Sequence, residues 1–380
     1  MKILLLSAYH AQSHKVWCDG LMQNFPEYQW QLMSLPARYF NWHMRGNALI
    51  WRTFEKEIIE KKFDLIIATS MVDLHGLRGF LPGLADIPSL LYFHENQFSY
   101  PQNSSQSQQV ELQLVSVYSA LSADIVVFNS KFNAQTFREG LEKLLRKLPD
   151  FTPKEIIEEI SKKTHILPVP LCESEYHACQ KKDDQFSIVW NHRWEYDKWP
   201  ENFFLTLLKL KQENVEFKVH VLGQQFRQQP PIFAKIKHDL DGVIQTWGRI
   251  EDDQKYRQTL SNSKIVVSTA LHDFQGLAVQ EAVMCGCVPV VPNRLAYPEF
   301  FQEVYLYESC PDNNERQANI LAMRLTQLAN ELANDQLISA PSLQVLSWSE
   351  MKKKYAEIFK LSIRCHRESG KVSLSDKSDR

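Results

Sequence analysis

Glycine is scarce in this chain. The 380 residues include 12 glycines, about 3% where average proteins have about 7%. No two glycines form a G-x-G pair, so the dinucleotide fingerprint G-x-G-x-x-G is missing, as is a G-x-x-x-x-G-K-[ST] phosphate loop. Both motifs need glycine to bring the backbone close to phosphate groups. The sequence therefore argues against dinucleotide-dependent oxidoreductases of the usual kind and against P-loop kinases.

An excess of charge and a long apolar run are lacking as well. The 43 basic and 45 acidic residues leave a net charge of −2, which excludes a broadly basic nucleic-acid binder but not a local basic patch. The apolar run at residues 3–6 is too short for a secretory leader or a membrane span. The seven cysteines are scattered, and Cys285 and Cys287 fit neither zinc nor thioredoxin spacing. We expect a cytoplasmic protein with reduced thiols, no metal site and no membrane or protein partner.

Short apolar runs alternate with helical patterns along the chain, which is typical of parallel βαβ units. The 44% of hydrophobic residues is enough to build substantial cores. The expected strands are residues 2–6, 30–35, 65–68, 89–93 and 125–128 in the first half, and 187–190, 218–222, 243–247, 264–268 and 288–291 in the second. Helical stretches are expected at 53–61, 110–121 and 131–163.

The sequence therefore predicts an α/β protein with two doubly wound Rossmann-like domains. Residues 1–170 form the first domain, the polar stretch 171–186 is a linker, and residues 187–346 form the second. An amphipathic helix at 347–363 and a serine-rich, disordered tail at 364–380 follow. Ligands of such sheets bind at the carboxyl ends of the strands, so we expect the active site in a cleft where the two domains face each other.

The most informative stretch lies in the second domain. After the strand at 264–268 come a loop with Asp273 and a short helix, opened by Gly276 and Leu277, that carries Glu281. Both carboxylates can face one bound ligand. The helix N-terminus suits a phosphate, and an acid at a strand end suits sugar hydroxyls.

Arg193 and Lys198 directly follow the first strand of the second domain. A planar guanidinium and a compact ammonium leaving one strand end suit a diphosphate held without metal. Such a pair on its own is also common in solvated loops. Trp194 and Trp199 flank the pair and pack either against a ligand or in the core.

An Arg/Lys pair after this strand, followed by two acids spaced as in E-x7-E, resembles the retaining glycosyltransferases with the GT-B fold. The resemblance covers nearly the whole chain, including a last helix that crosses back onto the first domain in such enzymes. It implies a nucleotide-sugar donor in the second domain and an acceptor in the first. The first acid here is Asp rather than Glu, which shortens its reach.

The GT-B resemblance also implies roles for individual residues of the second domain. Arg193 and Lys198 would hold the diphosphate, next to the helix opened by Gly276 and Leu277. Asp273 would contact the sugar hydroxyls, and Glu281 would bind the ribose. Arg249 lies in a loop that would read the base of the nucleotide.

Further motifs resemble the glycosyltransferase-like family that includes the tRNA-queuosine α-mannosyltransferases. These motifs are Ser7-Ala8-Tyr9-His10, Tyr92-Phe93-His94-Glu95-Asn96-Gln97, Phe128-Asn129-Ser130 and His272-Asp273-Phe274-Gln275-Gly276. The resemblance implies GDP-mannose as donor, with no cofactor. It implies as acceptor the cyclopentene-diol of queuosine in the anticodon of the tRNA for Asp.

Candidate residues of the first domain follow the strands 2–6 and 89–93. His94 should lie at the carboxyl end of its strand. Related GT-B enzymes place a histidine there beside the sugar, which makes His94 a candidate for the same role. The alternative is that His94 has only a structural role. Glu95 is a candidate acceptor contact and general base, with a solvated acid as the alternative and the leaving phosphate as the other source of a base. His10 and His14, expected in the loop after the first strand, are candidate acceptor contacts or solvated histidines.

Residues 28–54 contain no Asp or Glu. Basic and aromatic residues are interleaved there, namely Arg38, Tyr39, Phe40, Trp42, His43, Arg45, Trp51 and Arg52. Basic and planar groups together suit single-stranded RNA loops. We expect Arg45 and Arg52 to contact the anticodon loop of a tRNA; an aromatic helix facing the core with an arginine rim is the alternative.

Other functions fit parts of the same pattern. A GT-B glycosyltransferase with a different nucleotide-sugar and a small-molecule or lipid acceptor is the first alternative, although lipid acceptors usually bring a basic amphipathic helix. A two-domain receptor and an epimerase of the same fold are the others. A receptor of the periplasmic kind would carry a leader, and an epimerase would consume donor without any acceptor.

Overall fold

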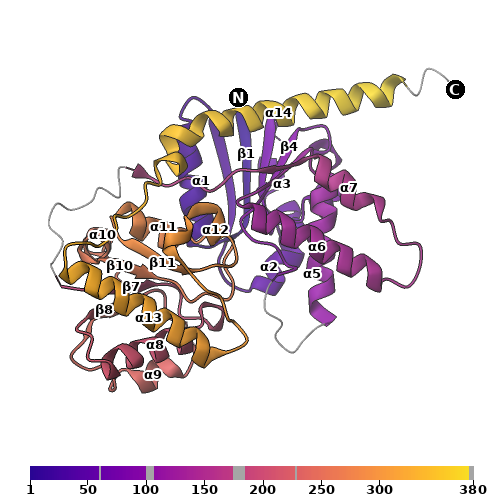
Figure 1. Cartoon of the computed structure of the whole chain (residues 1–380). Helices are drawn as coiled ribbons and strands as arrows, with labels where there is room; N and C mark the ends of the chain where they lie inside the picture. The colour runs from indigo at the N-terminus through magenta and orange to yellow at the C-terminus, as the bar shows by residue number, and fades with distance from the viewer. Residues whose placement is uncertain (60, 100–106, 174–184, 227–228, 376–380) are drawn as a thin grey trace. The chain divides into compact units, whose positions relative to one another are not determined.

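The computed structural model describes residues 1–59, 61–99, 107–173, 185–226 and 229–375. By its internal contacts the chain forms two compact units (Figure 1). Unit 1 comprises Met1–Pro170 together with Trp348–Arg380, and unit 2 comprises Leu171–Ser347.

Unit 1 is built on a parallel six-stranded sheet in the order β2-β1-β3-β4-β5-β6. The strands are β1 (Lys2–His10), β2 (Gln29–Pro36), β3 (Leu65–Thr69), β4 (Ser89–Phe93), β5 (Ile125–Phe128) and β6 (Thr164–Ile166). Residues in the central strands β3, β4 and β5 are buried throughout. Such strands are covered by helices on both faces, which explains their continuous apolar runs.

Helices of unit 1 cover both faces of this sheet. They are α1 (Gln12–Asn24), α2 (Phe40–Phe54), α3 (Lys56–Ile59), α4 (Leu74–Phe80), α5 (Ser107–Ser122), α6 (Lys131–Lys147), α7 (Glu155–Lys162) and α14 (Trp348–Ser375), with a 3-10 turn at Pro82–Leu84. One core cluster joins alternate residues of β1 such as Leu4 and Leu6 to Met44 and Trp51 of α2.

Helix α14 belongs to unit 1 although it ends the described chain, and it lies beside α1 and β4 (Figure 1). The hydroxyl of Tyr355 accepts a hydrogen bond from Trp17 Nε1 (3.0 Å) and donates one to the carbonyl of Pro168 (3.0 Å). A buried bond of this kind stabilises by about 1 kcal/mol. The return of the last helix to the first domain, predicted from the resemblance, is confirmed.

Unit 2 repeats the architecture with a parallel sheet in the order β12-β11-β10-β7-β8-β9. The strands are β7 (Ser187–Asn191), β8 (Lys218–Leu222), β9 (Ile244–Gly248), β10 (Ile265–Val267), β11 (Val288–Pro292) and β12 (Leu306–Tyr307). The α/β class with two doubly wound sheets, predicted from the alternating pattern, is therefore confirmed.

Helices α8 and α13 cover one face of this sheet, and α11 and α12 cover the other (Figure 1). The helices are α8 (Pro200–Gln212), α9 (Ile232–Ile236), α10 (Asp253–Asn262), α11 (Leu277–Met284), α12 (Tyr297–Phe300) and α13 (Asn314–Ala333), with 3-10 turns at Tyr196–Lys198, Glu303–Tyr305 and Gln344–Leu346. Trp194, one of the two tryptophans expected to flank the site, stacks on Phe233 in the core, with ring centroids 4.0 Å apart.

Three sequence-based expectations on elements were wrong. The tail at 364–380 was expected to be disordered, but its residues 364–375 belong to α14, in which His366 Nδ1 lies 2.9 Å from Asp124 Oδ1. Residues 376–380 lie outside the described residues. Residues 131–163 are two helices, because the segment between them carries two prolines that cannot donate helical hydrogen bonds. The helix expected at 53–61 is the end of α2 followed by the short α3. Most of the expected linker 171–186 lies outside the described residues.

Candidate functional site

The strand order of each unit creates a switch point between two neighbouring strands inside the sheet, β1 and β3 in unit 1 and β7 and β10 in unit 2. In unit 2, β7 pairs with β8 on one side and with β10 on the other, so the loops after β7 and β10 leave the sheet next to each other. Ligands of doubly wound sheets bind at this position, beyond the carboxyl ends of the strands. The loop after β7 carries Arg193 and Lys198, and the loop after β10 carries Asp273.

Lys198 is the centre of the polar cluster at this switch point. Its side chain is 9% exposed, and its ammonium lies 3.2 Å from Asp197 Oδ2 and 3.6 Å from Asp273 Oδ2. The same Nζ donates a hydrogen bond to the carbonyl of His272 at 2.5 Å. The structure thus brings together Lys198 and Asp273, two residues predicted from separate loops of unit 2. Two carboxylates around one ammonium leave a surplus negative charge.

Backbone hydrogen bonds hold the two loops in this arrangement. The N–H groups of Leu271 and His272 donate to the carbonyl of Asp197 at 2.8 and 3.2 Å. Thr269 Oγ1 donates to the carbonyl of Lys198 at 2.8 Å. The ammonium therefore sits on a fixed backbone, which is how a protein preorganises a charge for a ligand.

Asp273 also fixes the start of α11. Its Oδ1 accepts a hydrogen bond from the N–H of Gly276 (3.0 Å), and its Oδ2 accepts one from the hydroxyl of Tyr297 (3.2 Å). Gly276 has a φ of +80°, and a Cβ there would lie 2.8 Å from the Tyr297 ring, so only glycine fits. Leu277 is the first residue of α11. Contacts with α11 and with Lys198 therefore both fix the orientation of the Asp273 carboxylate.

Burial and charge set the protonation states of this cluster. Burial would raise the pKa of Asp273, but Lys198, the neighbouring histidines and the Gly276 N–H outweigh it and hold that pKa below its usual value. Burial, then Lys198, lowers the pKa of His192 to about 3 and that of His272 to about 4. At neutral pH Asp273 is therefore ionised and the imidazoles of His192 and His272 are neutral.

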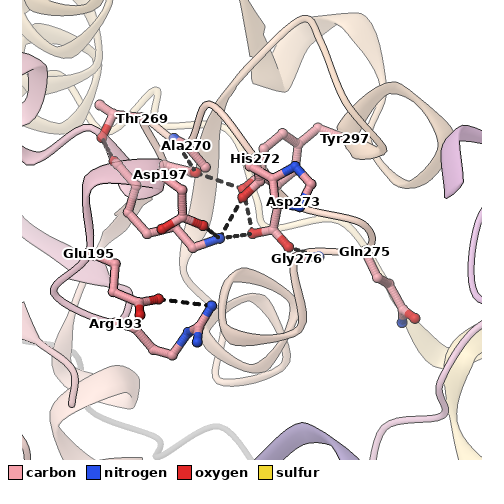
Figure 2. Close-up of polar contacts among 12 residues, drawn as sticks. Arg193, Glu195, Asp197, Thr269, Ala270, His272, Asp273, Gln275, Gly276 and Tyr297 are labelled. Carbon is pink, nitrogen blue, oxygen red and sulfur yellow. Dashed lines mark hydrogen bonds and ion pairs between the residues drawn. The ribbon is translucent and has the colours of Figure 1, made fainter. Parts of the chain in front are cut away.

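Arg193 and Glu195 form an ion pair of their own beside this cluster, with Nη2 and Oε2 3.0 Å apart (Figure 2). Arg193 is about half exposed. Burial raises the pKa of Glu195, although Arg193 opposes that shift. Glu195 therefore occupies the guanidinium face that was predicted to hold a diphosphate. Arg249, after β9, pairs with the exposed Glu251 at 3.2 Å.

Glu281 lies on α11 and is tied to the end of β7 rather than to Lys198. Its Oε2 accepts a hydrogen bond from the hydroxyl of Tyr256 (2.8 Å), and that hydroxyl accepts one from Asn191 Nδ2 (2.7 Å). Asn191 Nδ2 also donates to the carbonyl of Ala278 at 2.9 Å. A carboxylate held in one orientation by this chain suits the recognition of a diol.

Unit 1 has a matching cluster at its own switch point, between β1 and β3. Glu95 lies just beyond β4; its Oε1 accepts a hydrogen bond from the hydroxyl of Ser70 (2.6 Å), and its Oε2 lies 3.1 Å from His14 Nε2. His14 is in the first turn of α1, and Ser70 follows β3. The structure therefore brings together His14 and Glu95, 81 positions apart in the sequence.

His94 stacks on His14, with ring centroids 4.3 Å apart, and is buried against Trp17 and Tyr92. Neither ring nitrogen of His94 has a hydrogen-bond partner among the residues that the structure describes. Burial, then His14, lowers the pKa of His94 well below its usual value, so the ring is neutral. A buried imidazole without partners is unfavourable, and a bound hydroxyl group would satisfy it.

The remaining predicted residues of unit 1 make other contacts. His10 was expected in a loop, but it is the last residue of β1, where its Nδ1 lies 3.0 Å from Ser7 Oγ. Burial, followed by His14, lowers its pKa. Arg45 and Arg52 lie on α2, and Arg45 Nε donates to Glu111 Oε2 (2.8 Å) while Arg52 is exposed.

Several residues of both clusters were missed from the sequence. Asp197 and Glu195 are close in sequence to Lys198 and Arg193, and this closeness could have predicted that they pair with those cations. Folding brings three further residues into the clusters, namely Tyr256, Tyr297 and Ser70. Nothing in the sequence around these residues indicates that they contact the candidate site residues.

The described part of the chain has neither a group of metal-ligating side chains nor a membrane-spanning helix. Within those residues no group of three or more His, Cys, Asp or Glu side chains could hold a metal ion. None of the described helices combines the length and the apolar composition that crossing a bilayer requires.

Comparison with known proteins agrees with this geometry. Residues 2–171 match the family described as tRNA-queuosine alpha-mannosyltransferase N-terminal, and residues 174–327 match glycosyl transferases group 1. A tRNA-queuosine alpha-mannosyltransferase from Drosophila melanogaster is 31% identical over 367 residues, which are 94% of this chain and 96% of that protein.

Solved structures agree on the fold. A sucrose-phosphate synthase from Thermosynechococcus elongatus has a TM-score of 0.65 at 13% identity, over 95% of this chain and 98% of that one. HepE from Anabaena, in complex with UDP, has a TM-score of 0.61 at 13% identity, over 94% and 99%. The GT-B fold that the sequence predicted is confirmed. This chain is a glycosyltransferase and belongs to the tRNA-queuosine alpha-mannosyltransferase family.

Proposed function

We propose that this enzyme transfers mannose from GDP-mannose to queuosine in a tRNA anticodon, with retention of the anomeric configuration. The relative from Drosophila melanogaster, which aligns with nearly the whole chain, is named a tRNA-queuosine alpha-mannosyltransferase, a name that gives the transferred sugar and the acceptor. The observation that carries the proposal is the cluster of Lys198, Asp273 and α11 at the switch point of unit 2, a charged site on a rigid backbone. The cytoplasm is the proposed compartment, since tRNA is the substrate.

The donor half of the reaction belongs to unit 2. Arg193 would meet the diphosphate after parting from Glu195, and Lys198 with the N-terminus of α11 would stabilise the charge that develops when the sugar departs. Glu281, held by Tyr256, would bind the ribose hydroxyls. Arg249 would contact the base.

Asp273 would act on the sugar. It stays ionised because its pKa is held down, so it offers hydrogen-bond acceptors to the sugar hydroxyls and a negative charge near the oxocarbenium-like ring. Its two oxygens already accept from Gly276 and Tyr297. Each carboxylate oxygen has a second lone pair, so Asp273 can keep both of these hydrogen bonds when a sugar binds.

The acceptor half of the reaction belongs to unit 1. The neutral His94 has one donor and one acceptor nitrogen for hydroxyl groups, and both lack partners among the described residues. Glu95, oriented by Ser70 and His14, would accept a proton from the attacking hydroxyl or hold a neighbouring one. A front-face attack assisted by the leaving phosphate is the alternative route for that proton.

The test incubates the full chain with labelled GDP-mannose and tRNA, with and without queuosine. We expect label in queuosine-containing tRNA and no consumption of donor without acceptor. Arg193→Ala should weaken donor binding by roughly 10- to 100-fold, the value of a hydrogen bond to a charged group. Arg316→Ala, which breaks an exposed pair with Glu308 in the same unit, should retain transfer.

Three outcomes would contradict the proposal. Label that never enters queuosine-containing tRNA would remove the acceptor and favour a GT-B enzyme with a small-molecule or lipid acceptor. Donor consumed without acceptor would indicate an epimerase. Donor bound but never consumed would indicate a receptor.

A further inference from the structure

The outer face of α2 has an unusual composition. Trp42, Arg45, Leu49 and Arg52 follow one another at helical spacing, and all of them lie on one side of the helix. Trp42 is 52% exposed and Leu49 is 46% exposed. The opposite side of α2, with Met44, Ala48 and Trp51, is already packed in the core of unit 1.

Gly46 explains how the indole of Trp42 is held on this face. Gly46 lies in the middle of α2, where glycine is less favourable than alanine. A Cβ at this position would lie 2.8 Å from carbons of the Trp42 ring. The ring therefore lies flat against the helix backbone, and any larger residue at 46 would displace it. An exposed aromatic ring with a fixed seat is a preformed flat surface.

Tyr39 presents a second ring just before the first turn of α2. It is 70% exposed and adopts the left-handed conformation with φ 51° and ψ 48°, which is strained for a bulky residue. The guanidinium carbon of Arg38 lies 5.5 Å from the centre of its ring. The chain therefore tolerates backbone strain and keeps an aromatic ring in solvent beside a cation.

Charge indicates what kind of partner this face fits. Residues 28–54 contain no acidic residue. Arg38 and Arg52 are exposed, whereas Arg45 is paired with Glu111 of α5. Planar rings next to guanidinium groups suit the bases and phosphates of a single-stranded nucleic acid. A membrane-binding helix would expose its wide apolar face, but here that face is buried in the core of unit 1.

We propose that Trp42, seated on Gly46, stacks on an unpaired base of the RNA substrate, with Tyr39 as a second ring and Arg38 and Arg52 at the phosphates. This inference rests on the proposed function, because it names the surface that would receive the loop of the tRNA. The inference differs from the proposed function because it requires only that the chain binds an RNA loop, not that it transfers a sugar.

The test measures binding of an RNA hairpin with an unpaired loop, and of a blunt duplex of the same composition, by the full chain. Trp42→Ala should weaken hairpin binding by roughly 5- to 100-fold, the range for one lost base stack. Trp42→Phe should retain most of the affinity. Gly46→Ala should reduce it, because the added methyl displaces the indole without removing it. Duplex binding should change little in each case.

Phe151→Ala is the matched control, since Phe151 is also an exposed aromatic residue with positive φ in unit 1 but lies between α6 and α7. It should leave hairpin binding unchanged. Thermal unfolding followed by circular dichroism, measured on the same samples, should show a cooperative transition in every variant, which shows that each is folded.

Wild-type hairpin affinity in both Trp42→Ala and Gly46→Ala would overturn the inference. So would equal losses for hairpin and duplex, or Trp42-dependent binding to anionic vesicles in place of RNA. If mannose is never transferred but hairpin binding still depends on Trp42, the proposed function fails and this inference stands. If transfer occurs and Trp42→Ala leaves the KM for tRNA unchanged, this inference alone fails.

Discussion

Replacing Lys198 by methionine should destabilise unit 2 strongly at neutral pH. Methionine keeps much of the volume but removes the charge that contacts Asp197 and Asp273, both of which are largely buried. Removing one partner of a buried ion pair costs about 3–5 kcal/mol. A change of 1 kcal/mol shifts Tm by about 2–4 °C in a domain of this size, so we expect Tm to fall by about 6–20 °C.

The pH dependence of this variant should be opposite in sign to that of the wild type. In the wild type the folded pKa of Asp273 lies below its usual value, so its contribution to stability is full above that value and is lost as pH falls through the folded pKa. Without Lys198 the largest influence on Asp273 is burial, which raises its pKa. The variant should therefore gain stability as pH falls from neutral through that raised pKa.

The assay is thermal unfolding followed by circular dichroism between about pH 4.5 and 8, a window that begins just above the ordinary pKa of an aspartate. Lys209→Met is the control, because its ammonium contacts the exposed Glu315 on the surface of the same unit. Exposed pairs contribute about 0–1 kcal/mol, so the control should stay close to wild type. A Lys198→Met protein with wild-type Tm at neutral pH, or one that loses stability on mild acidification, would refute the reasoning.

Three other changes give further tests. Glu195→Gln should free Arg193 and tighten GDP-mannose binding, measured by calorimetry, by up to about 5-fold, since a half-exposed pair contributes at most about 1 kcal/mol. The difference from wild type should shrink as falling pH protonates Glu195, whose pKa is raised by burial. Weaker binding by the variant would argue against this role of Glu195. Gly276→Ala should lower Tm through a strained φ and contact with the Tyr297 ring, costing about 1–3 kcal/mol, whereas Gly79→Ala, in open space on α4, should not. Mannose transfer should survive EDTA, because the described residues offer no cluster of three metal-ligating side chains; loss of activity restored by one divalent ion would contradict this.

Much of the fold could be predicted from the sequence because its strands are continuous apolar runs. β4, β5 and β8 were predicted with the bounds that the structure has, since β4 and β5 are short apolar runs and β8 alternates polar and apolar residues. The two short outer strands β6 and β12 were missed, because strands of two or three residues at a sheet edge leave almost no pattern.

The candidate site could be predicted only as far as its loops. The carboxyl ends of β7 and β10 follow from the strand order, so Lys198 and Asp273 could be expected to meet, and they do. The sequence does not indicate that Glu195 would bind Arg193 or that Tyr256 would hold Glu281. Those contacts depend on side-chain directions in the folded loops.

The central claim is that unit 2 grips an activated sugar through Arg193, Lys198 and two carboxylates. A crystal structure of the full chain with GDP-mannose tests it most directly. We expect the diphosphate within hydrogen-bond distance of Arg193 and at the N-terminus of α11, with Glu195 moved away, and the ribose on Glu281. A nucleotide bound elsewhere, with the Arg193–Glu195 pair intact at 3.0 Å, would contradict it.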